Sequence, residues 1–270
     1  MHDSSSTLAA LRRRIERLGD GRNRRVSGSF ATGHAGVDKA IGGGFARGRL
    51  HELFGAEPED AGSASAFALL LTLLADDAPA EGRRKGCFLW LRTDDAMRRL
   101  GMPYGRGLAD LGIDPADMLL AVMPDDATVL RAAADALRCP VLCAVVIECW
   151  GNPGVLDLTA SRRLTLAAES AGTTALLLRL DAEPSPSAAE TRWRIAAAPS
   201  APLAANAPGH SSFDIALLRR RAGPDGLAWR LEWNRDQRCF IEPPFSGAVV
   251  PLSAAGPAAD SGTRTVVATG

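Results

Sequence analysis

Between Phe30 and Leu180, apolar runs of strand length alternate with longer stretches of helical composition. This alternation is typical of a mostly parallel sheet flanked by helices, because each strand must return over the sheet before the next one begins. We therefore predict an α/β fold. The expected strands span 49–54, 86–92, 118–123, 141–149 and 174–180, and the expected helices span 36–41, 63–75, 94–100, 104–111, 126–137 and 159–171.

After Leu180 the pattern changes. A polar loop (183–190) leads to a predicted strand at 191–197, and the turn sequence AGPDG separates two further strand patterns, 213–221 and 227–233. Two strand patterns around such a turn predict an antiparallel hairpin. Beyond Ile241 few large apolar residues remain, so we expect Pro243 to Gly270 to be a disordered tail.

The first residues form a separate unit in this reading. Leu8, Leu11, Ile15 and Leu18 recur at helical spacing, and a polar, glycine-containing link from Gly19 to Gly28 follows them. A helix this short is marginal alone in water, so its apolar stripe must bind a partner or pack on its own core. The predicted organisation is an arm (1–28), an α/β domain (29–241) and a tail (242–270).

Charge and length exclude several classes of protein. The 31 Lys and Arg residues balance the 31 Asp and Glu residues, which argues against a general electrostatic grip on nucleic acid. No apolar run is long enough to cross a bilayer, and the arginine-rich start has no signal core. We expect a cytoplasmic protein without a membrane anchor.

Three closely spaced cysteines raise the question of a metal site. Cys139, Cys143 and Cys149 lie in the run CPVLCAVVIECW, which is predicted to be a buried strand with all three on one face. At strand spacing Cys143 and Cys149 are roughly 20 Å apart, too far to share an ion. We expect reduced core thiols, no metal and no cofactor. The sequence also shows no hydrolase nucleophile motif, so no catalytic residue is predicted.

The segment from Gly55 to Ala64 has the place of a phosphate-binding loop between a strand and a helix. A working loop reads G-x-x-x-x-G-K-[ST], with lysine on the phosphates and a hydroxyl on Mg²⁺. Here six residues separate Gly55 from Gly62, Ser63 stands where lysine belongs, and Ala64 stands where the hydroxyl belongs. Three carboxylates also lie in the loop. The sequence therefore predicts a vestigial loop without ATP hydrolysis.

The order of these segments resembles the RecA/RadA recombinase core. TGHAGVDKAIGGGFARGRLHELFG is similar to the segment that leads into the recombinase loop, CFLWLRTDD to the strand of the catalytic glutamate, and AVVIECWG to the Walker B strand. The blocks LDLTASRRLTLAAESAGTTALLLR and TRWRIAAAPSAP are more specifically similar to the ImuA family, RecA-like accessory proteins of bacterial inducible mutagenesis cassettes. The resemblance covers about residues 7 to 241.

That resemblance implies a RecA-like core and a role in SOS-induced, error-prone lesion bypass. Its implied partners are ImuB, a polymerase-like protein of the Y family, an alternative polymerase III alpha-type subunit, and RecA. The catalytic glutamate of recombinases would fall at Thr93 or Asp94, and the Walker B aspartate at Glu148. The nucleotide-sensing glutamine would fall near Arg179 or Leu180, and the DNA-binding loops at 151–155 and 183–190.

Several residues keep two interpretations. Glu148 is either a retained metal-organising carboxylate or, in our preferred reading, a hydrogen-bonded structural acid. Adjacent arginines at 162–163 and 219–221 are candidate DNA or partner contacts, or else solvated faces; they are Arg162, Arg163, Arg219, Arg220 and Arg221. An alternative function is a SulA-like cell-division inhibitor that binds FtsZ, although the arm and the extension from Trp193 to Trp233 make this chain longer than a compact SulA-like core.

Overall fold

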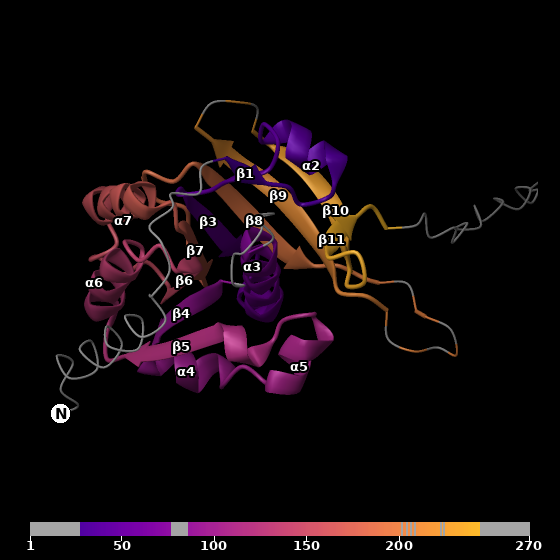
Figure 1. The fold of residues 1–270 in the computed structure, drawn as a ribbon, viewed down its shortest axis with the longest axis horizontal. Helices are drawn as coiled ribbons and strands as arrows, with labels where there is room; N and C mark the ends of the chain where they lie inside the picture. The colour runs from indigo at the N-terminus through magenta and orange to yellow at the C-terminus, as the bar shows by residue number, and fades with distance from the viewer. Residues whose placement is uncertain are drawn as a thin grey trace, which may run out of the picture.

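A computed structural model describes residues 28–76 and 86–243, apart from 201, 204, 206, 208, 222 and 224 (Figure 1). The predicted arm with Leu8, Leu11, Ile15 and Leu18 lies outside these residues, as does the predicted tail from residue 244 onward. The described part is built on one nine-stranded sheet with the order β11-β10-β9-β8-β3-β7-β6-β4-β5.

One half of this sheet is parallel and the other is antiparallel. The parallel strands are β3 (Leu50–Gly55), β4 (Cys87–Thr93), β5 (Met118–Met123), β6 (Leu142–Trp150), β7 (Thr174–Leu180) and β8 (Thr191–Ala197), of which β8 runs parallel to β3. From β8 the sheet continues antiparallel through β9 (Ser212–Arg220), β10 (Leu227–Asn234) and β11 (Cys239–Ile241). The predicted mostly parallel core with a C-terminal antiparallel hairpin is confirmed.

Helices cover both faces of the parallel half. One face packs against α3 (Ala61–Asp76), and the other packs against α6 (Asp126–Ala136) and α7 (Leu158–Ala171). Smaller elements lie around the sheet: α2 (Ala35–Ala40), α4 (Asp94–Leu100), α5 (Gly105–Asp110), the 3₁₀ turns η1 (Pro58–Asp60) and η2 (Pro115–Asp117), and the short pair β1 (Ser29–Phe30) and β2 (Phe45–Ala46). Among the described residues no helix is long and apolar enough to span a membrane.

Local sequence explains where the helices begin and end. The side chains of Thr93, Asp125 and Asp157 each accept a hydrogen bond from a first-turn backbone N–H of α4, α6 and α7. Such capping satisfies donors that a helix start otherwise leaves unpaired. Helix α7 ends at Gly172, which adopts the left-handed conformation that glycine tolerates best.

Two apolar clusters lie on opposite faces of the sheet. The cluster on the α3 face extends across the whole sheet and includes Trp193, Ile215 and Leu231 from β8, β9 and β10. The cluster under α6 and α7 draws its strand residues from β3 to β7 and none from the antiparallel strands. The two faces of the sheet are therefore covered unequally.

The cysteine prediction was wrong in one respect. Cys143 packs in the cluster on the α3 face, whereas Cys149 packs under α6 and α7, so the two thiols lie on opposite faces. The register of β4 against β6 shifts between Cys87 and Phe88, which places an extra residue in β6 near Cys143. Such a bulge reverses the in–out alternation that sequence parity assumes. Cys139 lies before β6 and not within it.

The remaining differences are small. The predicted strands and helices appear with shifts of one or two residues at their ends. The β1–β2 pair and β11 were not predicted, because strands of two or three residues leave no periodic signal. Gly44 is needed in the turn before β2: its φ is +116° and a Cβ there would lie 2.2 Å from the carbonyl oxygen of Phe30.

Candidate functional site

The carboxyl ends of β3, β4, β6 and β7 meet at one edge of the sheet, where open α/β sheets bind ligands. The loop that the sequence predicts to be vestigial lies there, between β3 and α3. It leaves Gly55, passes through the 3₁₀ turn η1 and enters α3 at Ala61, so Gly62, Ser63 and Ala64 belong to the first turn of the helix. The predicted strand–loop–helix arrangement is present.

Two backbone N–H groups of the loop are already hydrogen-bonded to other parts of the protein or to the loop itself. The N–H of Ala56 donates to the carbonyl oxygen of Ile195 (2.8 Å), and the N–H of Glu57 donates to the carboxylate of Asp60 (3.2 Å). That carboxylate also accepts a hydrogen bond from the N–H of Ala197 (2.7 Å), which ties the loop to β8. In a phosphate-binding loop these amides would face the nucleotide. Here the N–H of Glu57 binds the carboxylate of Asp60, and the N–H of Ala56 binds a carbonyl oxygen of β8.

The groups that would hold ATP–Mg²⁺ are missing at their positions. Ala64 presents a fully buried methyl group where a hydroxyl would bind the metal. Lys39 lies exposed on α2, in another part of the fold. With Glu57 and Glu59 exposed at the loop, the local charge is also wrong for a polyanion. The residues present do not fit a bound nucleotide with its metal.

Glu148, at the Walker B-like position, is engaged in a buried network. Its Oε1 accepts hydrogen bonds from Arg92 Nη2 and Trp150 Nε1, and its Oε2 accepts one from Trp90 Nε1, each at 2.8 Å. Glu148 is fully buried and Arg92 is 2% exposed. Arg92 also donates to the carbonyl oxygen of Gly101 (2.8 Å). This network agrees with the interpretation of Glu148 as a structural acid.

Thr93 and Asp94, the two predicted positions of the recombinase catalytic glutamate, lie at the start of α4. Thr93 caps α4 through its hydroxyl, which accepts a hydrogen bond from the N–H of Ala96. Asp94 follows as an exposed residue in the first turn of α4. The hydrogen-bond partners of Glu148 in the described part of the chain are Arg92, Trp90 and Trp150, and neither Thr93 nor Asp94 is among them.

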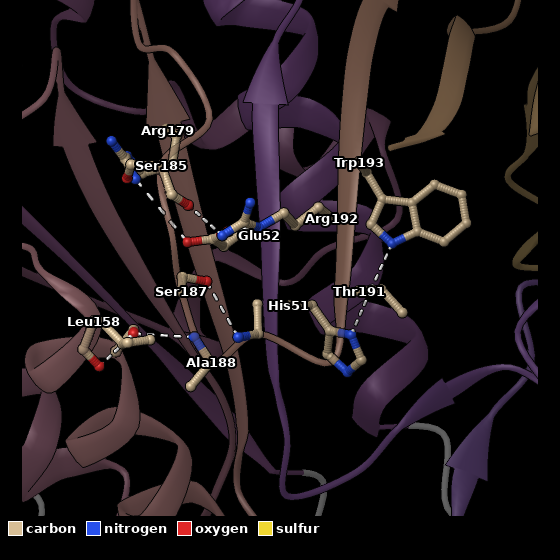
Figure 2. Close-up of polar contacts among 12 residues, drawn as sticks. His51, Glu52, Leu158, Arg179, Ser185, Ser187, Ala188, Thr191, Arg192 and Trp193 are labelled. Atoms are coloured by element: carbon tan, nitrogen blue, oxygen red, sulfur yellow. Dashed lines mark hydrogen bonds and ion pairs between the residues drawn. The ribbon is translucent and has the colours of Figure 1, made fainter. Parts of the chain in front are cut away.

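A second buried cluster joins β3, β7 and β8 on the opposite face of the sheet (Figure 2). Glu52 Oε2 lies 2.7 Å from Arg192 Nε, and Glu52 Oε1 lies 4.0 Å from Arg179 Nη1. Arg179 is 2% exposed, and its guanidinium lies over the ring of Phe54. Burial lowers the pKa of Arg179, and the negative charge of Glu52 partly offsets this effect. We call these three charged residues the Glu52 cluster.

The Glu52 cluster contacts the loops after β6 and β7, which the family resemblance predicts to take the place of the recombinase DNA-binding loops. Arg179 donates to Asn152 Oδ1 (2.6 Å) in the loop after β6, and Arg192 donates to the carbonyl oxygen of Ser185 in the loop after β7. The second loop is also tied to α7, because Ser161 Oγ accepts a hydrogen bond from the N–H of Ala188 (3.1 Å; Figure 2). Both loops are thus anchored from beneath by charged groups of the sheet.

His51 is a further buried polar group of β3. Its Nδ1 lies 2.8 Å from Thr191 Oγ1, and its Nε2 lies 2.9 Å from the carbonyl oxygen of Ala46. Burial lowers the pKa of His51 to about 4, although the hydrogen bond to Ala46 opposes this shift. The imidazole is therefore neutral at physiological pH and serves to join β2, β3 and β8.

The structure separates the arginines that the sequence grouped. Arg162 and Arg163 are exposed on α7. Arg220 turns toward α2 and donates to the carbonyl oxygen of Ala40 (2.8 Å), which makes it a structural contact. Arg219 and Arg221 are exposed. No group of three or more potential metal ligands occurs among the residues that the structure describes.

The sequence reading missed the Glu52 cluster. The signal was present: Glu52 and Arg179 each interrupt an otherwise apolar strand. A charge inside a buried strand requires a partner, because an unpaired buried charge is very costly. The sequence could not show that the partners come from strands more than a hundred residues apart, such as β3 and β7.

Comparisons with known proteins agree with this architecture. No family model matches the chain. Over 202 residues it is 33% identical to Protein ImuA of Caulobacter vibrioides, strains NA1000/CB15N and CB 15, an alignment that covers 71% of this chain and 77% of the relative. The crystal structure of the RadB recombinase superposes with a TM-score of 0.52 at 15% identity, covering 80% of this chain and all of RadB, so it shares the fold. The chain belongs to the ImuA family and has a RecA-like fold.

Proposed function

We propose that this chain is a non-catalytic, cytoplasmic RecA-like adaptor in SOS-induced, error-prone translesion DNA synthesis. It acts with an ImuB-type polymerase-like protein and an alternative polymerase III alpha-type subunit, and RecA is a further candidate partner. Membership in the ImuA family supports the biological setting. The two loops anchored by the Glu52 cluster favour a fixed scaffold over recombinase-style DNA loops that rearrange.

One observation carries the non-catalytic part of the proposal. The carboxylate of Glu148 is fully buried and accepts hydrogen bonds from Arg92, Trp90 and Trp150. A carboxylate engaged by three donors is not available to organise Mg²⁺, which usually keeps several waters and is held by one or two carboxylates together with substrate phosphates. Two further features support a non-catalytic protein: Ala64 has a methyl group where a metal-binding hydroxyl would be needed, and Asp60 accepts hydrogen bonds from the N–H groups of Glu57 and Ala197.

Titration calorimetry with ATP–Mg²⁺ tests this part. We expect no measurable binding by the wild type, and none by a Ser63→Lys variant, because the loop remains two residues too long and Ala64 still lacks a hydroxyl. Micromolar affinity of the wild type for ATP–Mg²⁺ would show that the protein is not a simple adaptor.

Purified full-length chain and the candidate partners from the same genome test the adaptor part. Co-elution with the ImuB-type protein, strengthened by the alpha-type subunit, is the expected result. FtsZ serves as the comparison protein in this experiment. Binding to FtsZ without binding to any polymerase-like protein or RecA would instead support the SulA-like alternative.

A further inference from the structure

In the described part of the chain, one face of the antiparallel end of the sheet lies outside both layers of covering helices. On the α3 face, Trp193, Ile215 and Leu231 are buried in the large cluster. The opposite face of the same strands contributes nothing to the cluster under α6 and α7, and among the described residues no helix packs on it. Figure 1 shows α6 and α7 together at one end of the sheet, with β10 and β11 at the other.

Strand register defines the residues on this face. Arg194 pairs with Ala216, which pairs with Ala228, and Ala196 pairs with Asp214, which pairs with Arg230. Directly paired residues point to the same side of a sheet. A bulge at Arg192/Trp193 brings Arg219 opposite Arg192 and so onto the same side. The surface, called the outer hairpin face below, comprises Arg194, Ala196, Asp214, Ala216, Arg219, Ala228 and Arg230.

The outer hairpin face carries uncompensated positive charge. Arg230 forms two hydrogen bonds with the carboxylate of Asp214 (2.7 and 2.8 Å), so this pair is neutral. Arg194 and Arg219 are both exposed, and neither has an ion-pair partner within the described part of the chain. Glu232, at the far end of β10, is only 6% exposed.

The floor of the face is made of alanines. Ala196, Ala216 and Ala228 lie between the arginines and are at least partly accessible. Small side chains on a sheet allow the backbone of an approaching helix to come close, and the two arginines then reach its carboxylates. The geometry favours a short amphipathic helix with acidic residues along its flank.

Segments of this chain outside the described residues are poor occupants on charge. Residues 1–27 contain seven arginines against three acidic residues, so Arg194 and Arg219 would repel them. Residues 77–85 contain two acidic and three basic residues, and residues 244–270 contain one aspartate and one arginine, so neither segment brings net negative charge. The occupant must bring its negative charge from another protein.

We propose that the outer hairpin face binds an acidic helix of a protein partner; this inference rests on the proposed adaptor function and identifies the surface that performs it. Nucleic acid fits the face less well. Single-strand binding surfaces stack bases on aromatic side chains, but the aromatic residues of β8, β9 and β10 lie on the opposite face, as Trp193 and Phe213 do. Two free arginines are also few for a phosphate backbone.

The test reverses the two free charges. A double variant, Arg194→Glu with Arg219→Glu, is compared with a control, Arg98→Glu with Arg138→Glu, which changes the net charge equally at exposed positions outside the face. Binding of the full-length proteins to the ImuB-type protein and to RecA is measured by interferometry. We expect the double variant to lose at least about tenfold in affinity, and the control to stay within about twofold.

Salt and fold serve as checks on the same samples. The difference between wild type and double variant should shrink from about 50 mM to about 300 mM NaCl, because salt screens exposed charges. Melting temperatures verify that both variants fold. If the glutamate variant is unfolded, Arg194→Gln with Arg219→Gln replaces it, with an expected loss of at least about threefold.

Each other outcome overturns the inference in a recognisable way. If wild type binds a partner and the double variant binds equally well, the outer hairpin face is not the docking surface, and the adaptor function stands. If wild type binds neither partner, the adaptor function itself fails and this inference falls with it. If only binding of a labelled single-stranded oligonucleotide is lost, the face serves nucleic acid instead.

Discussion

Replacing Glu148 by Gln removes one charge from a buried ion pair at almost constant volume. In the wild type, Glu148 Oε1 and Oε2 accept from Arg92, Trp150 and Trp90, and the exposed side-chain fractions of Arg92 and Glu148 are 3% and 0%. The glutamine oxygen can keep two of these donors. Its amide group then faces the indole N–H of Trp90, donor against donor, and Arg92 stays charged without a counterion.

The expected cost follows from these two effects. Breaking a buried ion pair by removing one partner typically costs about 3–5 kcal/mol. For a domain of about 200 residues, each kcal/mol lowers the melting temperature by about 2–4 °C, so we expect a drop of about 6–20 °C. As the control, Asp95→Asn removes an exposed carboxylate of α4 that pairs with Arg98 and Arg99, and should leave the melting temperature nearly unchanged because exposed ion pairs add little to stability.

Urea unfolding and thermal melts of Glu148→Gln, Arg92→Met and the double variant, each compared with the wild type, form a double-mutant cycle. Because Arg92→Met removes the charge that Glu148→Gln leaves without a counterion, the double variant should lose less unfolding free energy than the two single variants together, by about 0.5–3 kcal/mol. A carboxylate kept for metal binding would behave differently, since its amide often leaves stability unchanged or raises it. An unchanged or higher melting temperature for Glu148→Gln would refute the structural role.

Three further predictions concern the pH response, the backbone and the arm. The pKa of His51 is about 4 in the folded protein and about 6.5 in the unfolded chain, so between these pH values the unfolded chain binds the extra proton. The free energy of unfolding of wild type should therefore approach that of His51→Gln as the pH falls from 7 to 4. A constant difference between the two proteins in urea unfolding would contradict this. Gly44→Ala should destabilise the fold by about 2–4 kcal/mol, because a positive φ and a facing backbone oxygen leave no room for Cβ. The control Gly62→Ala, whose Cβ would meet no atom within 4 Å, should be neutral or stabilising. Equal melting temperatures of the two variants would argue against the turn geometry. Changing Leu11 and Ile15 to Asp should weaken partner binding and leave the melting temperature within about 2 °C if the arm docks on a partner, whereas a loss of several kcal/mol would show that it packs on its own core.

Patterns along the chain were sufficient to predict the layered architecture. The strand at 174–180 was predicted with the bounds that the structure has, because a continuous apolar run of strand length can be buried on both faces only inside a parallel sheet. The expectation of a vestigial loop also came from residue types at fixed spacing, because Ser63 and Ala64 are not the types that a phosphate-binding loop uses; it remains a prediction. The arm and the tail remain predictions.

Tertiary structure decided the features that depend on pairing between distant strands. A single extra residue in β6 placed Cys143 and Cys149 on opposite faces, and no residue type in the sequence marks that bulge. The partners of Glu52 come from β7 and β8, more than a hundred residues away. Within the run 219–221, only register shows that Arg219 points to solvent and Arg220 toward α2. Sequence determines which residues must be buried or paired, because that is a local property of charge and hydrophobicity; which partners they find is a property of the assembled sheet.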